Sequence, residues 1–300
     1  MSCPGNGAIW CLTVIVPLHG RMEHEFARPN LKGCTAELKG VERMTIAFLK
    51  LARKLLPVGL YNGLISVAYL AKVVISLGGT VRQTCPICGF IGRFSAFGLP
   101  PRFNARCPKC RSLERHRLFV LCDVKHELLN TQQSVLHFAP EEAISTFISG
   151  RVRDCTTADI ESGQADLQLD LENVDLPGAA FDVVIANHVL EHVDDAKALK
   201  EIFRILRPGG RFISMVPIVE GWERTYENPS IRTPAEREHH FGWRDHVRYY
   251  GRDYRDRILR TGFQLEEFGA SGAECAKYGL VRGDKVFVGT KPGAVASLGD

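Results

Sequence analysis

From residue 134 onward, short apolar runs alternate with stretches of helical period, and this alternation limits the fold more than any other feature. Strands that alternate with helices predict a parallel sheet covered by helices. The sequence therefore predicts an α/β fold. The expected strands are 134–138, 155–159, 167–170, 181–187 and 211–216, with helices over 142–149 and 195–206. Two late strands, 262–268 and 285–289, follow with only a loop-like segment between them.

Polar residues stand at the carboxyl ends of these strands, where ligands of such sheets bind. Asp159 follows the first strand by about twenty residues, and a carboxylate there can accept hydrogen bonds from both hydroxyls of a ribose. Asp170 ends the third strand, at the place of an adenine amino group. Asn187 and His188 end the fourth strand and face the reacting group. The pattern indicates a nucleotide-like cofactor.

Four segments of the chain carry a family resemblance: Asp159, Leu169-Asp-Leu171, the run from Phe181 to His192, and Leu206-Arg-Pro-Gly-Gly210. Together they resemble the successive motifs of class I S-adenosylmethionine-dependent methyltransferases of the type 11 kind, over residues 133 to 290. The resemblance implies a Rossmann-like seven-stranded sheet, mostly parallel, with the last strand antiparallel. It also implies an enzyme that uses S-adenosylmethionine. The implied cofactor contacts are His137, Ala139, Glu141, Asp159, Asp170, Leu171, Asn187 and His188.

The first loop departs from this family's pattern. It usually reads acid-x-Gly-x-Gly, so that bare backbone can approach the methionine part of the cofactor. This chain has His137-Phe-Ala-Pro-Glu141, in which Pro140 lacks an N–H and Glu141 replaces a glycine. Either Glu141 or His137 contacts the cofactor's ammonium group, or the pocket has lost affinity and the protein is a scaffold. The other motifs favour the first interpretation.

Two cysteine pairs, Cys85-Pro-Ile-Cys88 and Cys107-Pro-Lys-Cys110, precede the predicted sheet. Each spacing lets a tight turn point both sulfurs at one ion, and four thiolates complete a closed tetrahedral zinc site. A redox motif explains one pair but not two. We therefore predict a structural zinc ribbon with a linking helix over residues 80–130. The linking helix, 112–129, has His116 as a candidate extra ligand and these expected buried positions: Leu113, Leu118, Leu121, Leu128 and Leu129.

The segment 44–79 is apolar and helical in character. Residues 55–71 carry no charge, and Lys50, Arg53 and Lys54 precede them. This length is at the lower edge of what a membrane span requires. We prefer a helix that packs on the catalytic domain. The second alternative is a helix over 46–78 that lies at a membrane surface with its cationic end among the headgroups, and the third is a membrane span.

The remaining boundaries follow from these segments. Residues 1–43 show no sustained period and are expected to be a poorly ordered extension, the methyltransferase domain covers 131–292, and 293–300 form a tail. Paired cysteines in an α/β protein of this size favour the cytoplasm, with peripheral membrane contact as an option.

Candidate catalytic groups lie in two places. His188 and His192 follow the fourth strand and would share one face if that turn were helical. A long polar and aromatic insert after the fifth strand carries the second set. That set is His240, Asp245, His246 and Arg248, proposed for acid–base chemistry and anion binding.

Three functions stay open at the level of sequence. The first is methyl transfer to a hydroxyl of a small molecule, sugar or glycan precursor. The second is RNA methylation through the basic stretch from Arg82 to Glu127, which holds nine Lys or Arg against three acids. The third is a non-catalytic binding protein on the same scaffold.

Overall fold

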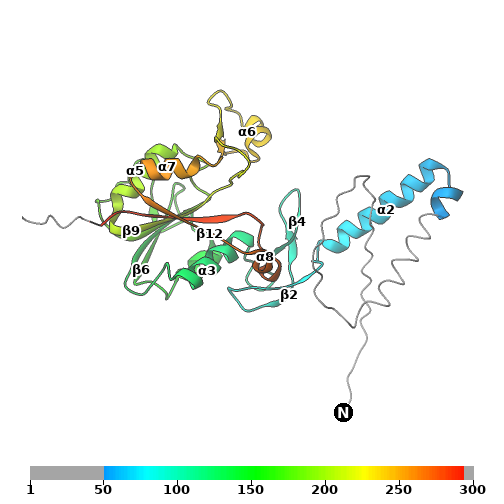
Figure 1. Cartoon of the computed structure of the whole chain (residues 1–300), viewed down its shortest axis with the longest axis horizontal. Coiled ribbons are helices and arrows are strands. Elements are labelled where there is room, and N and C mark those ends of the chain that lie inside the picture. Colours follow the sequence, from blue (N-terminus) through cyan, green and yellow to red (C-terminus); the bar gives the residue numbers. More distant parts are fainter. Residues whose placement is uncertain (1–50, 294–300) are drawn as a thin grey trace, which may run out of the picture. The chain divides into compact units, whose positions relative to one another are not determined.

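The computed structural model describes residues 51–293, and the chain divides into two compact units, Met1–Leu77 and Gly78–Asp300. The predictions for residues 1–43 and 294–300 lie outside the described residues. In the first unit, residues 51–55 are helical and α2 covers Val58–Ser76 (Figure 1). Within the described residues, α2 is the one helix that is long and apolar enough to cross a membrane, by length and composition only.

The packed, interfacial and spanning interpretations of this segment all remain predictions. None of the residues of α2 is buried, and side chains such as Val58, Val67 and Tyr69 are each more than half exposed.

The second unit is built on a seven-stranded sheet with the order β12-β13-β9-β8-β5-β6-β7. The bounds are β5 Ser134–Phe138, β6 Asp154–Asp159, β7 Leu167–Gln168, β8 Phe181–Asn187, β9 Leu206–Met215, β12 Gln264–Gly269 and β13 Lys285–Thr290. Strands β5 to β9 pair in parallel, while β13 runs antiparallel to both β9 and β12. This arrangement confirms the expected fold class.

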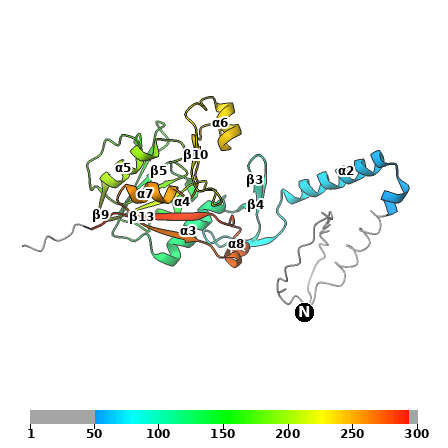
Figure 2. The ribbon, with the colours of Figure 1, turned by 45° about the horizontal axis from the view of Figure 1, so that its top comes forward.

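Helices cover both faces of this sheet (Figure 2). They are α3 Glu114–His126, α4 Glu142–Ile148, α5 Asp195–Ile205, α7 Tyr254–Arg260 and α8 Gly272–Tyr278. Alternate residues of β8 enter two different cores, as the two-residue period of a strand requires. Val184 packs with Leu199 of α5, whereas Val183 packs with Leu118 of α3. Burying such a side chain contributes about 1.5–3 kcal/mol.

Two predicted boundaries were wrong. The segment between β12 and β13 is not a loop but contains α8, because Ser271 and Glu274 form a capping box at its start and Gly279 ends it in the left-handed conformation. Helix α5 ends at Ile205, and the Pro-Gly-Gly segment belongs to β9. The amide of Gly209 donates to the carbonyl of Lys291, which extends the strand pairing.

The cysteine ribbon, residues 82–110, consists of two antiparallel hairpins. Its strands are β1 Arg82–Thr84, β2 Ile91–Arg93, β3 Ser95–Phe97 and β4 Arg102–Arg106. Helix α3 follows and confirms the linking helix. The five leucines expected to be buried are all buried.

Arg117 of α3 joins this ribbon to the catalytic domain. Its side chain is fully buried and stacks over the ring of Phe94, 4.6 Å from the ring centre. The guanidinium donates to the carbonyls of Ala105 and Ser112 on the ribbon side, at 3.0 and 2.7 Å. It also donates to the carbonyls of Tyr278 and Gly279 at the end of α8, at 2.7 and 2.6 Å. One side chain therefore satisfies four carbonyls from two parts of the fold.

The insert after β9 contains β10 Tyr226–Glu227, α6 Pro234–Phe241 and β11 Arg248–Tyr249, and β10 pairs with β11. Arg248 is buried. It donates to the carbonyl of Leu190 at 2.8 Å and to the carboxylate of Glu227 at 2.9 Å. The insert is thereby fixed to the turn that follows β8. Arg248 is engaged inside the protein, so the expected role in anion binding is not supported.

Candidate functional site

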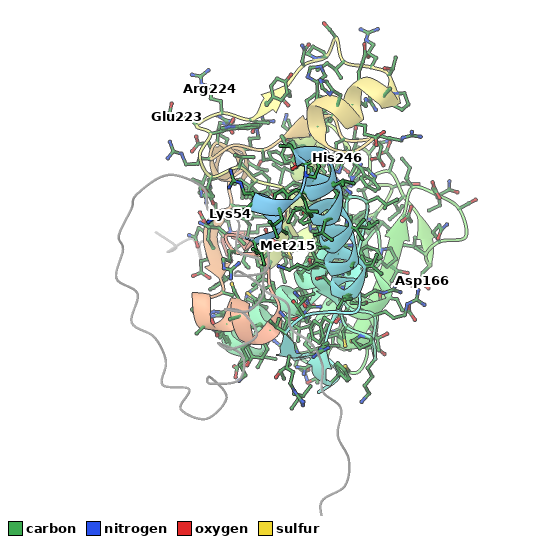
Figure 3. The ribbon with its side chains drawn as sticks, turned by 90° about the vertical axis from the view of Figure 1, so that its right-hand side faces the viewer. Lys54, Asp166, Met215, Glu223, Arg224 and His246 are labelled. Atoms are coloured by element: carbon green, nitrogen blue, oxygen red, sulfur yellow. The ribbon has the colours of Figure 1, made fainter. Side chains whose placement is uncertain are left out.

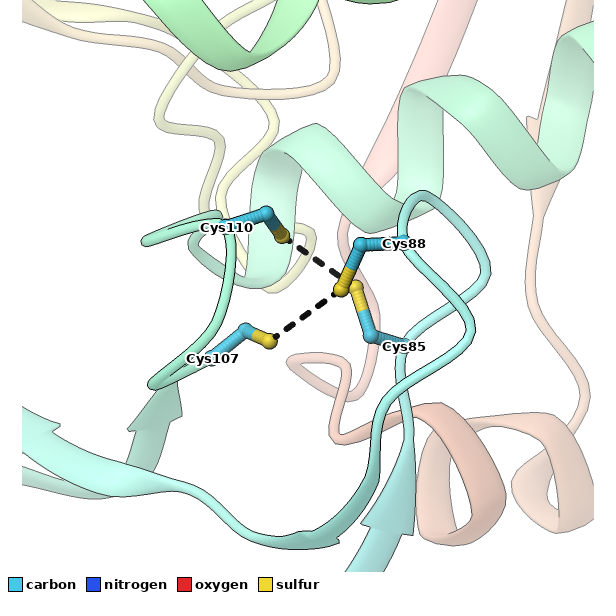
Figure 4. A group of neighbouring side chains, drawn as sticks. All are labelled: Cys85, Cys88, Cys107 and Cys110. Carbon is cyan, nitrogen blue, oxygen red and sulfur yellow. Dashed lines mark hydrogen bonds between the residues drawn. The ribbon is translucent and has the colours of Figure 1, made fainter.

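The four predicted cysteines converge between the ribbon's two hairpins (Figure 4). The Sγ atoms of Cys85 and Cys110 lie 3.5 Å apart, and those of Cys88 and Cys107 lie 3.7 Å apart. All four are free thiols. A tetrahedron with zinc–sulfur bonds of about 2.3 Å has edges of about 3.8 Å, so these separations fit a four-thiolate site. The side chain of Ser112 contacts Cys85 and Cys110, at 3.4 and 3.2 Å.

His116, the candidate extra ligand, has another role. Its Nδ1 accepts a hydrogen bond from the amide of Leu113 at 3.1 Å and so caps the start of α3. Its Nε2 lies 2.8 Å from the carboxylate of Glu141. Both ring nitrogens are therefore engaged away from the cysteines.

The first loop keeps the backbone shape that a glycine would give. Ala139 has φ +46°, in the left-handed region that costs a residue with a Cβ roughly 1–2 kcal/mol. Its amide donates to the carbonyl of Ala158 at 2.9 Å, which holds the loop between β5 and α4 against the end of β6. The loop conformation survives the loss of glycine.

Glu141 and His137 are less available to a cofactor than the sequence suggested. Arg115 and His116 of α3 both contact the Glu141 carboxylate. Burial raises the pKa of Glu141, but the hydrogen bonds from His116 and Arg115 outweigh burial and hold it at about 2. His137 is 1% exposed within β5, and burial lowers its pKa to about 4. Sequence reasoning missed Arg115 as the partner of Glu141, because the two are far apart in the chain.

The other predicted cofactor residues lie at the carboxyl edge of the sheet, as expected. Asp159 is half-buried at the end of β6, and one carboxylate oxygen accepts from the amide of Glu161 at 2.9 Å. Asp170 is exposed and accepts from the amide of Glu172 at 2.8 Å. Leu171 is buried in the core, so only its backbone faces this edge. Asn187 is buried, and its side-chain oxygen has no hydrogen-bond partner.

His188 stands at the end of β8 in a turn rather than a helix, with φ +55°. Its amide donates to the carbonyl of Met215 at 2.7 Å, which fixes the turn against β9. Its Nδ1 lies 3.3 Å from the Glu191 carboxylate, and its Nε2 is buried without a partner. Because the turn is not helical, His188 and His192 do not share a helix face.

A cavity of about 220 Å³ lies between the ribbon and the carboxyl ends of β8 and β9. It is lined by Arg102, Glu114, Arg115, His188, Met215, Val216, Pro217, Val281, Asp284 and Lys285. Arg102 and Glu114 pair across its wall at 3.1 Å. Burial raises the pKa of Asp284, which sequence reasoning missed because it stands outside every motif.

The insert brings part of the second predicted set to the same edge. Asp245 lies 3.3 Å from Nδ1 of His192, and the rings of His192 and His246 meet edge to face, 4.7 Å between centres. Figure 3 shows His246 below α6. His240 is exposed on α6 and hydrogen-bonds the hydroxyl of Tyr226 at 2.7 Å, so it stands apart from this group.

Comparison with known proteins identifies the sheet. A family model described as "Methyltransferase domain" matches residues 121–214, which contain β5 to β8, α5 and most of β9. Residues 121–214 are therefore similar to a methyltransferase domain. A curated protein of Mycolicibacterium smegmatis, described as "Probable S-adenosylmethionine-dependent methyltransferase", is 45% identical over 49 residues, or 16% of this chain. The match spans about a fifth of that relative, 19% of its length.

Solved structures similar to the methyltransferase domain include the YcgJ protein of Bacillus subtilis, with 14% identity and a TM-score of 0.42. That match covers 59% of this chain and 99% of the other. An S-adenosylmethionine-dependent methyltransferase from Mesorhizobium loti has 15% identity and a TM-score of 0.41, over 56% of this chain and 96% of its own.

The contact between Glu141 and α3 predicts a pH-dependent contribution to stability. The Glu141 carboxyl has its pKa lowered from 4.5 to about 2, so its contribution is full above pH 4.5 and is lost as the pH falls toward 2. We expect Glu141→Gln to lower the free energy of unfolding by about 2 kcal/mol at pH 7.

Urea unfolding of both proteins between pH 7 and pH 3.5 measures this difference, which should shrink toward the acid end. Glu142→Gln, at the exposed neighbouring position, is the control and should change stability by less than about 0.5 kcal/mol. A constant difference across this range would contradict the ion pair.

Proposed function

We propose that the protein transfers a methyl group from S-adenosylmethionine to a hydroxyl of a small molecule, sugar or glycan precursor. The observation that carries this proposal is His188, which lines a cavity at the end of β8 and whose Nε2 has no partner. The Glu191 carboxylate lies 3.3 Å from Nδ1 on the other side of the ring. His188 is therefore placed to take a proton from an acceptor hydroxyl.

Cofactor binding is assigned to the edge of β5, β6 and β8. S-adenosylmethionine supplies an activated methyl group on a sulfonium when bound, so the protein mainly has to align the acceptor with it. The free carboxylate oxygen of Asp159 suits a ribose hydroxyl. The unpartnered side-chain oxygen of Asn187 suits the positively charged end of the cofactor. The Glu141 carboxylate is paired with Arg115 and His116 of α3. We therefore assign it the role of holding the loop, not that of binding the ammonium group of the cofactor.

We also infer that the four cysteines hold a structural zinc ion. Their sulfur separations and their position between two short hairpins support this. A closed four-sulfur site has no open position for a substrate, so the ion would stabilise the ribbon rather than react.

RNA is the second candidate acceptor. The basic stretch that suggested it is partly neutralised, because Arg102 pairs with Glu114, Arg115 with Glu141 and Lys125 with Glu274, while Arg117 is buried. The exposed cations that remain are Arg82, Arg93, Lys109 and Arg111. A hydroxyl acceptor in the cavity is therefore preferred to a polyanion on the ribbon. A non-catalytic binding protein on the same scaffold is the third candidate.

Peripheral contact with a membrane is a further part of the proposal. Residues 51–77 contain no acidic residue, while Arg53, Lys54 and Lys72 are basic and α2 exposes apolar side chains all round. Anionic headgroups attract each such cation by about 1 kcal/mol. The cytoplasm suits the seven described cysteines, which are all free thiols.

Titration of S-adenosylmethionine tests the cofactor assignment. We expect wild-type protein to bind it and Asp159→Ala to bind at least about tenfold more weakly, about 1.4 kcal/mol, because the ribose loses a charged acceptor. Calorimetry measures both. Asp256→Ala, an exposed acid on α7, is the control and should match wild type. A folded, zinc-loaded wild type that binds no cofactor would favour the scaffold.

Methyl transfer from labelled S-adenosylmethionine tests the acceptor. We expect label in metabolites or glycans of a cell extract, and a fall in kcat of about 10²–10⁴-fold in His188→Gln, with cofactor affinity kept. His239→Gln, on the exposed side of α6, should retain activity. Label found in RNA instead, with salt-sensitive binding, would reject the hydroxyl proposal in favour of the second candidate.

Sedimentation with lipid vesicles tests the membrane contact. We expect the full chain to sediment with vesicles rich in anionic lipid and much less with neutral vesicles. Arg53→Glu together with Lys54→Glu should reduce binding several-fold, because two attractive charges become repulsive. Lys200→Glu together with Arg260→Glu, the same charge change at exposed positions of α5 and α7, controls for net charge. Full recovery of the wild type in the supernatant would exclude the proposal.

A further inference from the structure

A group of three potential metal ligands lies beside the cavity, separate from the cysteines. One ligand atom from each of Glu191, His192 and His246 lies within 4.8 Å of the others. The first two come from the turn after β8, and His246 comes from the insert just before β11. Neither segment alone supplies the set.

Glu191 gives an independent sign that a cation belongs here. Its side chain is fully buried, and neither carboxylate oxygen has a hydrogen-bond partner. Nδ1 of His188 lies 3.3 Å away, but without hydrogen-bond geometry. An isolated buried carboxylate costs several kcal/mol, and buried charges in proteins are paired or coordinate metals.

The two histidines are held as metal-binding histidines usually are. Nδ1 of His192 faces the carboxylate of Asp245 at 3.3 Å, and Nδ1 of His246 faces the carbonyl of Phe241 at 3.2 Å. An oxygen behind one ring nitrogen fixes the ring and leaves the other nitrogen as the ligand. The backbone supports the same junction, because the amide of Val247 donates to the carbonyl of Glu191 at 2.9 Å.

We propose that Glu191, His192 and His246 bind one divalent transition-metal ion, distinct from the four-cysteine site. Two imidazoles and one carboxylate suit ions such as Mn²⁺, Co²⁺ or Zn²⁺ better than a thiolate-seeking ion. Three protein ligands leave open positions, where acceptor oxygens could bind beside His188. That role toward the acceptor rests on the proposed function, whereas binding of the ion does not.

This proposal gives a function to the insert that follows β9. It supplies His246 and the Asp245 and Phe241 oxygens that orient both rings, and Arg248 holds it to the turn after β8. A metal site that needs the insert would tie assembly of the acceptor pocket to the part of the chain that the methyltransferase motifs leave unused.

Cobalt titration of the zinc-loaded full chain tests the site. We expect one equivalent of Co²⁺ to bind in addition to the zinc, with weak visible bands and without the intense sulfur-to-cobalt absorption that a cysteine site would give. Calorimetry should show Glu191→Gln and His246→Ala each weakening this binding by at least about tenfold. His240→Ala, on the same insert but hydrogen-bonded to Tyr226, is the matched control and should bind as wild type.

The cobalt titration tests metal binding independently of methyl transfer. No methyl acceptor is needed, so an inactive protein can still bind cobalt. A folded wild type that takes up no cobalt beyond the cysteines would overturn the proposal, as would equal binding by folded His246→Ala. Circular dichroism of each variant shows whether it has folded, and His246 is only half-buried, so that variant keeps the test decisive if Glu191→Gln fails to fold.

Discussion

The buried guanidinium of Arg117 is the interaction on which the second unit depends. A ribbon of four short strands has too little apolar surface to hold a position by packing alone. Arg117 fixes it by satisfying two carbonyls of the ribbon side and two at the end of α8. The cavity beside His188 has Arg102 of the ribbon and two residues of α3 in its wall, so its shape depends on this junction.

Helix α3 carries this constraint from the ribbon to the cofactor loop. It begins directly after the second cysteine pair, and its first turn supplies Arg115 and His116 to Glu141. In the family pattern a glycine stands at Glu141 and the loop is shaped by bare backbone. Here the left-handed conformation of Ala139 and the ion pair of Glu141 replace that freedom with fixed contacts. The departure from the family motif is therefore better explained by attachment to the ribbon than by loss of the cofactor pocket.

The parts that sequence could predict are those set by local pattern. Strands β5 and β8 and helix α5 follow from the apolar period, and the convergence of the four cysteines follows from their spacing. The missed parts depend on residues distant in the chain. Nothing near Arg117 shows that it binds Gly279, and nothing near Glu191 shows that His246 lies beside it. The role of α2 stays a prediction, because an apolar period does not say what covers the helix.

The turn after β8 shows how one short segment can serve two chemical tasks. A carboxylate has two oxygens, so Glu191 can face Nδ1 of His188 and still ligate a cation with its other oxygen. His188 would then act on a hydroxyl that the cation holds and makes more acidic, and neither group need displace the other. This division explains why the buried carboxylate is retained although it costs stability in the absence of a partner. It also explains why the insert returns to this turn, since His246 completes a ligand set that β8 alone lacks.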